Sequence, residues 1–260
     1  MQALATHEWP PGRADAEAPV AVLVHGVTGW HRTWWRVGPA LAERGWRVVA
    51  VDQRGHGRSP RIEGNASVAD LAADLGGVID RIGAPVDALI GHSLGAAVSA
   101  ELAFLRPGVA RRLVLEDPPA VSRADDSLWL EKLEREILAA ASRPDAEAER
   151  ERAENPAWLP EDVAQNVEGR ALADGPGIVA SFRRDTGARV PDLVARLSVP
   201  TLYLLAADDR SVYVGQARRR LVAELPATSR LQVIDAGHTI HRDRFDAWMT
   251  AVLGWLEPAR

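Results

Sequence analysis

The chain of 260 residues contains no cysteine. This absence excludes a disulfide scaffold, a thiol nucleophile and a thiolate metal site. Lysine is almost absent as well: Lys132 is the only one, and arginine supplies the other positive charges of the side chains. The formal net charge is -5 at pH 7. It argues against a nucleic-acid partner, which would require a basic face.

Long apolar runs are also missing. No stretch approaches the roughly 18 consecutive apolar residues of a membrane-spanning helix. The first residues, MQALATHEWPPGRADAEAPV, lack the basic segment and apolar core of a secretory signal. We therefore expect no membrane span and a cytoplasmic location. Apolar residues make up 47% and charged residues 26% of the chain, as in globular proteins, and the length fits one large domain with an insertion.

Short apolar segments recur along the chain and predict buried strands. They are continuous and rich in β-branched residues, which favours strands covered on both faces. The six segments are residues 20–25, 47–52, 86–91, 112–116, 201–207 and 229–234. Helical patterns separate several of them, notably over 67–82 and 241–256. Alternation of strands and helices predicts a parallel sheet with right-handed crossovers.

The alternation stops between residues 118 and 189. Several helical patterns without strands follow one another there, and the charged segment DAEAERERAEN (145–155) predicts a solvated helix. We therefore predict a core of residues 1–117 and 190–260 and a helical insertion over 118–189. Ligands of open α/β sheets bind beyond the carboxyl ends of the strands. An insertion that leaves such an end is expected to cover the site as a lid.

The segment LIGHSLGAAVSAELAF (89–104) contains the pattern Gly-x-Ser-x-Gly. This pattern is typical of a sharp turn between a strand and a helix, in which Gly91 and Gly95 leave no room for Cβ atoms. The turn exposes the hydroxyl of Ser93 above the sheet. It also places the N–H of Leu94 at the N-terminus of a helix, where it can stabilise negative charge.

A serine nucleophile needs a base, because its hydroxyl is a weak nucleophile at neutral pH. His238, in IDAGHTIHRD, follows a late predicted strand and is the candidate base; His241 is expected to be a neighbour. The base needs a carboxylate to orient it. Four candidates follow predicted strands: Asp208, Asp209, Glu116 and Asp117. The glycines of HGVTGW let the N–H of Val27 serve as a second donor to an oxyanion.

Together these motifs give the chain a resemblance to the α/β-hydrolase superfamily. HGVTGWHRTWW, DQRGHGRS, GHSLG, AADDRSVY and DAGHTIH stand in that family's order, and the resemblance covers residues 20 to 256. It implies that Ser93 is the nucleophile, His238 the general base, and Val27 and Leu94 the oxyanion donors. It selects Asp209 as the acid, with Glu116, Asp117 and Asp208 as alternatives. It also makes DQRGHGRS a structural loop.

The resemblance further implies a mostly parallel sheet of seven or eight strands with flanking helices. The segment ALATHEW (3–9) is the candidate for an antiparallel edge strand, which would make seven. The implied activity is hydrolysis of a carboxylic ester or lactone, without a cofactor or metal. Trp30 stands beside the HGVTGW loop, and Trp129 and Trp158 stand in the predicted lid, so we expect these residues to line an apolar pocket for a small apolar substrate.

Other activities of the same superfamily stay open. They are hydrolysis of a C–C bond, perhydrolase or cofactor-free haloperoxidase activity, and a ligand receptor or cofactor-free oxygenase that keeps the triad. Epoxide and haloalkane hydrolysis are not expected, because that branch has Asp at the position of Ser93.

Overall fold

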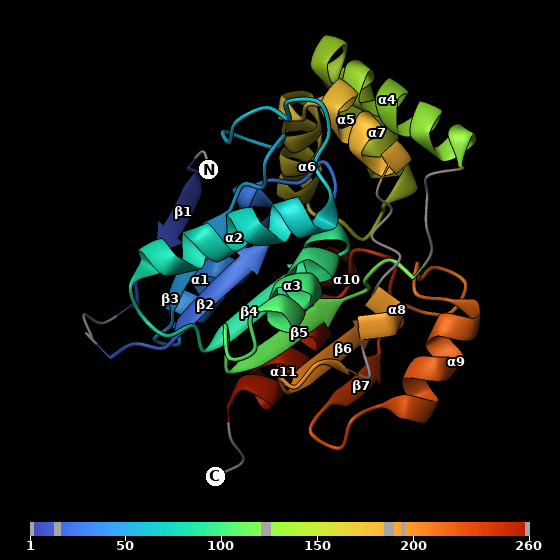
Figure 1. Ribbon diagram of the computed structural model, residues 1–260. Coiled ribbons are helices and arrows are strands. Elements are labelled where there is room, and N and C mark those ends of the chain that lie inside the picture. The colour runs from blue at the N-terminus through green and yellow to red at the C-terminus, as the bar shows by residue number, and fades with distance from the viewer. Residues whose placement is uncertain (1–2, 13–16, 121–125, 185–189, 194–195, 258–260) are drawn as a thin grey trace.

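A single mixed sheet forms the centre of the molecule (Figure 1). The computed structural model describes residues 3–12, 17–120, 126–184, 190–193 and 196–257. The strands are β1 (Thr6–Trp9), β2 (Val20–Val24), β3 (Arg47–Val51), β4 (Ala88–His92), β5 (Arg112–Glu116), β6 (Thr201–Leu205) and β7 (Arg230–Val233). Only β1 is antiparallel to its neighbour. The predicted mostly parallel sheet is thus confirmed, with seven strands.

The order of the strands creates a crevice at one point of the sheet. The order is β1-β3-β2-β4-β5-β6-β7, so β2 lies between β3 and β4. The chain moves outward from β2 to β3 and then crosses back to form β4 on the other side of β2. The direction of the connections therefore reverses at β2. In such sheets the loops on the two sides of this point run in opposite directions and leave room for a ligand at the carboxyl ends of the strands. The site described below lies at the carboxyl ends of β2 and β4.

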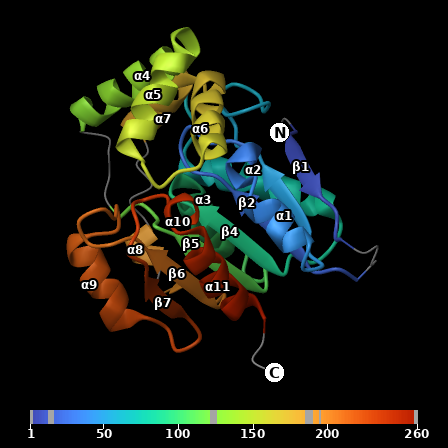
Figure 2. The same cartoon turned by 180° about the vertical axis from the view of Figure 1, so that it is seen from behind.

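Helices cover both faces of the sheet (Figures 1 and 2). Alternate residues of each central strand enter opposite cores: Val22 packs with helices on one face and Leu23 with helices on the other. The first face carries α2 (Val68–Ile82), α3 (Leu94–Leu105), α8 (Val190–Leu193) and α9 (Gly215–Glu224). The second face carries η1 (His31–Trp34), α1 (Val37–Ala42), α10 (Ile240–Asp243) and α11 (Phe245–Leu256). The helix predicted over 241–256 is divided at Arg244, whose φ of -140° and ψ of 56° are not helical.

The chain between β5 and α8 forms a helical insertion of four described helices, called the inserted helices below. They are α4 (Ser127–Ser142), α5 (Pro144–Glu154), α6 (Pro160–Leu172) and α7 (Gly175–Arg184), and they pack beyond the carboxyl ends of the strands (Figure 1). Leu130, Leu133 and Ile178 belong to a small apolar core of their own. The prediction of a solvated helix over 145–155 is wrong in one respect, because two glutamates of α5 are buried in an ionic network.

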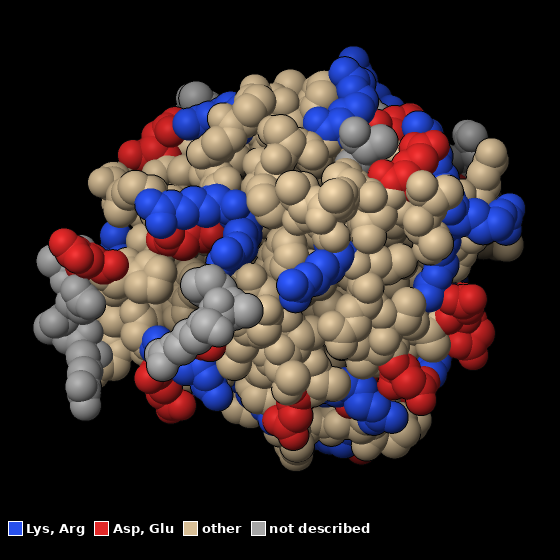
Figure 3. All heavy atoms as spheres, turned by 90° about the horizontal axis from the view of Figure 1, so that it is seen from below, with Lys and Arg blue, Asp and Glu red and all other residues tan. Residues whose placement is uncertain are grey.

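The face opposite the inserted helices carries Lys or Arg interspersed with Asp and Glu (Figure 3). Charges of both signs are separated by broad uncharged areas among the described residues of this face. This view therefore offers no continuous basic surface of the kind that binds a nucleic-acid backbone. Within the described ranges, no helix has both the length and the apolar character needed to cross a membrane.

His25, His56 and His92 are three of the five histidines that are buried among the described residues. Burial lowers the pKa of each below 6.5, and that of His56 falls to about 3. A buried imidazole resists protonation because the cation would lose its hydration. All three rings are therefore neutral at neutral pH in the folded protein.

These histidines should make the protein less stable in mild acid. Below pH 6.5 the unfolded chain binds protons that the folded chain does not, so the free energy of unfolding falls as pH decreases. For His56 this loss runs from pH 6.5 down to about 3, at up to about 1.4 kcal/mol for each pH unit. Urea denaturation at pH 7.5 and 5.5 should show a smaller loss in His56→Asn than in the unmodified protein. Equal losses would contradict this role of His56.

Candidate active site

Ser93 lies in a sharp turn between β4 and α3. Its φ of 51° and ψ of -118° are unfavourable for a residue with a side chain. The turn is tight because α3 begins directly against the sheet: a Cβ atom on Gly95 would overlap the carbonyl oxygen of Val24. One on Gly91 would overlap the carbonyl of Gly95 in the same way. The N–H of Ser93 donates to the carbonyl of Glu116 at 2.9 Å. The turn predicted from Gly-x-Ser-x-Gly is present.

His238 lies in the loop between β7 and α10 and contacts the serine. Its Nε2 is 2.9 Å from the Oγ of Ser93. The Nε2–H of His92 donates to the backbone carbonyl of His238 at 3.1 Å, and the two rings pack at 4.8 Å between centroids. Burial holds the pKa of His92 well below its usual value, so this ring is a neutral support for the loop.

Asp117 completes a hydrogen-bonded chain with these two residues. The Nδ1 of His238 lies 2.7 Å from Oδ2 of Asp117, which leaves Nε2 to accept the hydroxyl of Ser93. Asp117 is fully buried directly after β5 and has a φ of 39°. Its carboxylate accepts the N–H of Val212 at 3.0 Å and the hydroxyl of Ser211. These donors come from the loop after β6 and fix the carboxylate toward His238.

The predicted place of Asp209 beside His238 is therefore wrong. The side chain of Asp209 is 82% exposed and lies 3.6 Å from Arg210. Asp208 is 85% exposed and pairs with Arg218. Both side chains point to solvent, whereas the residues that follow them turn inward and donate to Asp117. The loop AADDRSVY thus holds the carboxylate instead of supplying it.

Glu116, the other alternative, belongs to a different buried contact. Its carboxylate accepts the backbone and Nδ1 hydrogens of His241, at 3.0 and 2.9 Å, and the Nε1–H of Trp248 at 3.0 Å. Burial acts to raise the pKa of Glu116, but His241 and His92 outweigh it and leave the pKa below its usual value. Glu116 therefore joins β5 to α10 and α11.

The backbone beside Ser93 offers two N–H donors. Leu94 is the first residue of α3, and Val27 lies in the turn after β2. Neither N–H donates to an acceptor among the described residues. A Cβ atom on Gly26 would lie 3.1 Å from the Cβ of Ser93, so glycine lets this turn approach the serine. His25 braces the turn, because its Nδ1–H donates to the Gly26 carbonyl at 2.7 Å.

Strained backbone gathers at this edge of the sheet. Among the described residues other than glycine, positive φ occurs at Thr28, Ser93 and Asp117, which follow β2, β4 and β5. Each such conformation costs about 1–3 kcal/mol and persists only where the surroundings impose it. Their gathering around one hydroxyl marks this edge as a candidate active site.

A cavity of about 410 Å³ opens over Ser93 and His238. Trp129 and Trp158 line it from the inserted helices, as predicted. Trp30 is not among its lining residues; it is 1% exposed, and its Nε1–H donates to the Gln165 carbonyl at 3.1 Å. One wall of the cavity is the sheet edge, and the other is formed by α4, α5 and α6.

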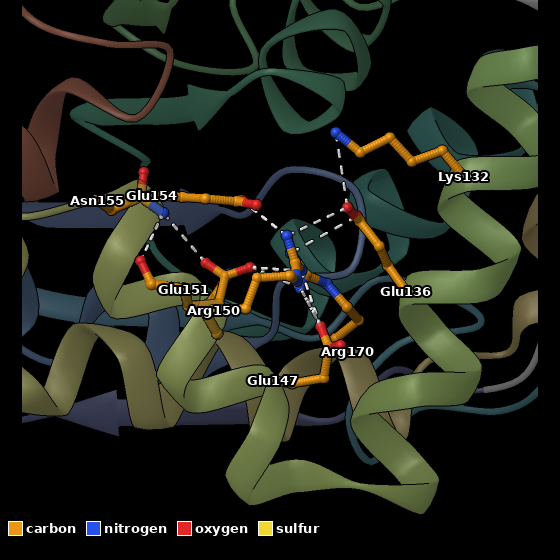
Figure 4. A network of polar contacts seen from close by, with 9 residues as sticks. Lys132, Glu136, Glu147, Arg150, Glu151, Glu154, Asn155 and Arg170 are labelled. Atoms are coloured by element: carbon orange, nitrogen blue, oxygen red, sulfur yellow. Dashed lines mark hydrogen bonds and ion pairs between the residues drawn. The ribbon is translucent and has the colours of Figure 1, made fainter.

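The wall formed by the inserted helices is charged (Figure 4). Arg150 lies 2.8 Å from Glu147 and 2.7 Å from Glu154, and its hydrogen bond to Glu147 raises its pKa. Arg170 lies 2.7 Å from Glu151. Such a wall binds polar groups more readily than hydrocarbon. The predicted apolar pocket is thus wrong for this side of the cavity.

The chain matches the sequence profile described as alpha/beta hydrolase fold over residues 19–245. It is 35% identical over 209 residues to the protein named "Putative carbamate hydrolase RutD" of Variovorax paradoxus, covering 77% of each chain. It is 27% identical to the sn-1-specific diacylglycerol lipase ABHD11 of Mus musculus, covering 93% of this chain and 82% of the lipase.

The fold is similar to that of solved hydrolases. A thermophilic esterase from Thermogutta terrifontis, solved with malate bound, superimposes with a TM-score of 0.74 at 25% identity, covering 97% of this chain and 92% of the esterase. The profile match spans most of the chain and includes the turn at Ser93. This protein therefore belongs to the alpha/beta hydrolase fold family, and it is a hydrolase.

Proposed function

We propose that this hydrolase cleaves a carboxylic ester or lactone through an acyl-enzyme on Ser93, with His238 as general base and Asp117 as the orienting acid. The hydrogen-bonded chain from Ser93 through His238 to Asp117 carries this proposal. The same arrangement of residue types performs acyl transfer on several unrelated folds.

In the acylation step, Nε2 of His238 takes the proton of Ser93 as Oγ attacks the carbonyl carbon. Asp117 accepts the Nδ1–H throughout and stabilises the imidazolium that forms. The carbonyl oxygen becomes an oxyanion, which the N–H groups of Val27 and Leu94 stabilise. The C–O bond to the leaving group then breaks, and His238 gives its proton to the leaving oxygen.

Water completes the cycle by the same route. His238 removes a proton from a water molecule, which attacks the acyl carbon of the ester on Ser93. The second oxyanion collapses, Oγ leaves, and the proton on Nε2 returns to it. The products are a carboxylic acid and an alcohol, or a hydroxy acid from a lactone.

The inserted helices act in this proposal as a lid that selects the substrate. Support comes from the cavity, whose walls are the sheet edge on one side and α4, α5 and α6 on the other. Its volume suits a small molecule, and its charged wall suits a polar one.

A carbamate is a second candidate for the acyl bond. The relative from Variovorax paradoxus carries that activity in its name. A carbamoyl group on Ser93 would form by the same steps. Comparing p-nitrophenyl acetate with p-nitrophenyl carbamate as substrates separates the two, because the true substrate class should give the higher kcat/KM.

Ser93→Ala should lower ester turnover by several orders of magnitude, because it removes the attacking oxygen. The variant should fold normally, since alanine differs only by the hydroxyl. Turnover of a series of p-nitrophenyl esters measures the loss, and circular dichroism confirms the fold. A folded variant with near-normal kcat would contradict the role of Ser93.

Asp117→Asn should reduce kcat roughly 10⁴-fold, because an amide can leave the imidazole in the wrong tautomer. Asp209→Asn and Asp208→Asn serve as matched controls and should remain close to the unmodified enzyme, since both side chains are exposed. If Asp209→Asn were the inactive variant and Asp117→Asn nearly normal, the acid would have to come from the loop after β6.

A further inference from the structure

Arg242 is a buried cation in the wall of the catalytic cavity, and it forms no ion pair with the part of the chain that the structure describes. It lies on α10, four residues after His238, and is 4% exposed. Its Nε–H is buried and has no acceptor among the described residues. Within those ranges the contact of the guanidinium group is with the ring of Trp158, and it forms no hydrogen bond or ion pair. A buried charge is costly unless something pairs with it.

The other cations of the cavity are already paired (Figure 4). Arg150 contacts several glutamates, and Arg170 lies 2.7 Å from Glu151. Lys132 lies 3.7 Å from Glu136. Each of these three cations therefore has a carboxylate partner within 4 Å, whereas Arg242 has none among the described residues.

The carboxylates whose charge acts on Arg242 are Asp162, Glu151 and Glu116, and each has another partner; Glu151 pairs with Arg170. Asp162 accepts the Nε1–H of Trp35 at 2.8 Å, and Glu116 accepts hydrogens from His241 and Trp248. They attract the guanidinium at longer range without pairing with it. Burial lowers the pKa of Arg242 to about 10. The side chain is thus still a cation at neutral pH.

The guanidinium is held in place by an aromatic ring. Its Cζ lies 4.6 Å from the ring centre of Trp158, and the Nε1–H of Trp158 donates to Asp243 at 2.7 Å. Asp243 also accepts the N–H of Gly237, the residue before His238. A stacked guanidinium loses less freedom on binding a ligand than a mobile one. These contacts link its position to that of the base.

We propose that Arg242 binds a carboxylate carried by the substrate, so that the enzyme hydrolyses esters or lactones of acids with a second carboxylate. This assignment rests on the proposed serine hydrolase function. The planar fork of arginine fits a carboxylate with two parallel hydrogen bonds. A singly charged carboxylate suits this cavity better than a doubly charged phosphate, because Glu151, Glu154 and Asp243 also line it.

Matched pairs of ethyl esters test this assignment. Monoethyl succinate, glutarate and adipate are compared with ethyl butanoate, pentanoate and hexanoate, which carry a methyl group in place of the second carboxylate. The unmodified enzyme should show the higher kcat/KM for the acid ester of at least one pair. In Arg242→Gln the ratio of the two kcat/KM values should fall roughly 10- to 100-fold, mainly through KM of the acid ester. Arg242→Lys should restore part of the ratio.

Arg219→Gln is the control for the loss of one positive charge, since Arg219 is exposed on α9 away from the cavity. It should leave the ratio unchanged. A ratio that did not fall in Arg242→Gln would overturn the assignment. A preference for the neutral ester in every pair of the unmodified enzyme would do the same.

Binding of glutarate separates this assignment from the catalytic proposal. Calorimetry on Ser93→Ala should detect glutarate, and the affinity should fall at least 10-fold in Ser93→Ala with Arg242→Gln. This readout does not need turnover, so it stands even if Ser93 proves not to be the nucleophile. Equal affinity in both proteins, or inorganic phosphate binding more tightly than glutarate through Arg242, would overturn the assignment.

Discussion

The close packing of α3 against β2 and β4 is the constraint on which the site depends. Only glycine at 91 and 95 lets the helix begin so near the sheet. The turn between them forces Ser93 into an unfavourable backbone conformation and directs the start of α3 toward the same edge. The buried apolar sheet stabilises this strain, since its central strands are almost fully covered on both faces. A rigid sheet thus holds Ser93 in a strained conformation.

The neighbouring strands β5 and β6 explain how the carboxylate that contacts His238 can lie after β5 instead of in the predicted loop after β6. They run parallel and end side by side, so a carboxylate after either strand can reach the loop that carries His238. In this chain the carboxylate follows β5, and the loop after β6 supplies donors to it. One loop thus carries the carboxylate, and the other fixes its orientation. Asp117 is oriented from one side by this loop and contacts His238 on the other.

Much of the fold could be predicted from the sequence because the strands are short, apolar and separated by clear helical patterns. Ser93 and His238 could be placed because each follows a predicted strand within a recognisable motif. The carboxylate that contacts His238 could not be placed in this way. Four carboxylates lie at or just after the ends of strands, and only the direction of each side chain distinguishes them. Asp208 and Asp209 turn outward, and Glu116 turns toward α10.

The charged wall formed by the inserted helices was not predicted for a similar reason. The segment 145–155 has the composition of an exposed helix, and nothing local shows that Arg170, from another helix, pairs with Glu151. The contacts of His92 and Arg242 were not predicted either. His92 stands inside GHSLG next to the serine, which is a local signal for a supporting role. Arg242 becomes conspicuous only when the partners of all neighbouring charges are known.

Covalent labelling tests whether Ser93 is the activated nucleophile. The enzyme is incubated with a fluorophosphonate, digested and analysed by mass spectrometry. We expect one adduct, on the peptide that contains Ser93, with fragment ions that place it on Ser93 itself. The adduct should be absent from Ser93→Ala. An adduct on another residue, or none at all in an enzyme that still hydrolyses esters, would show that Ser93 is not the nucleophile.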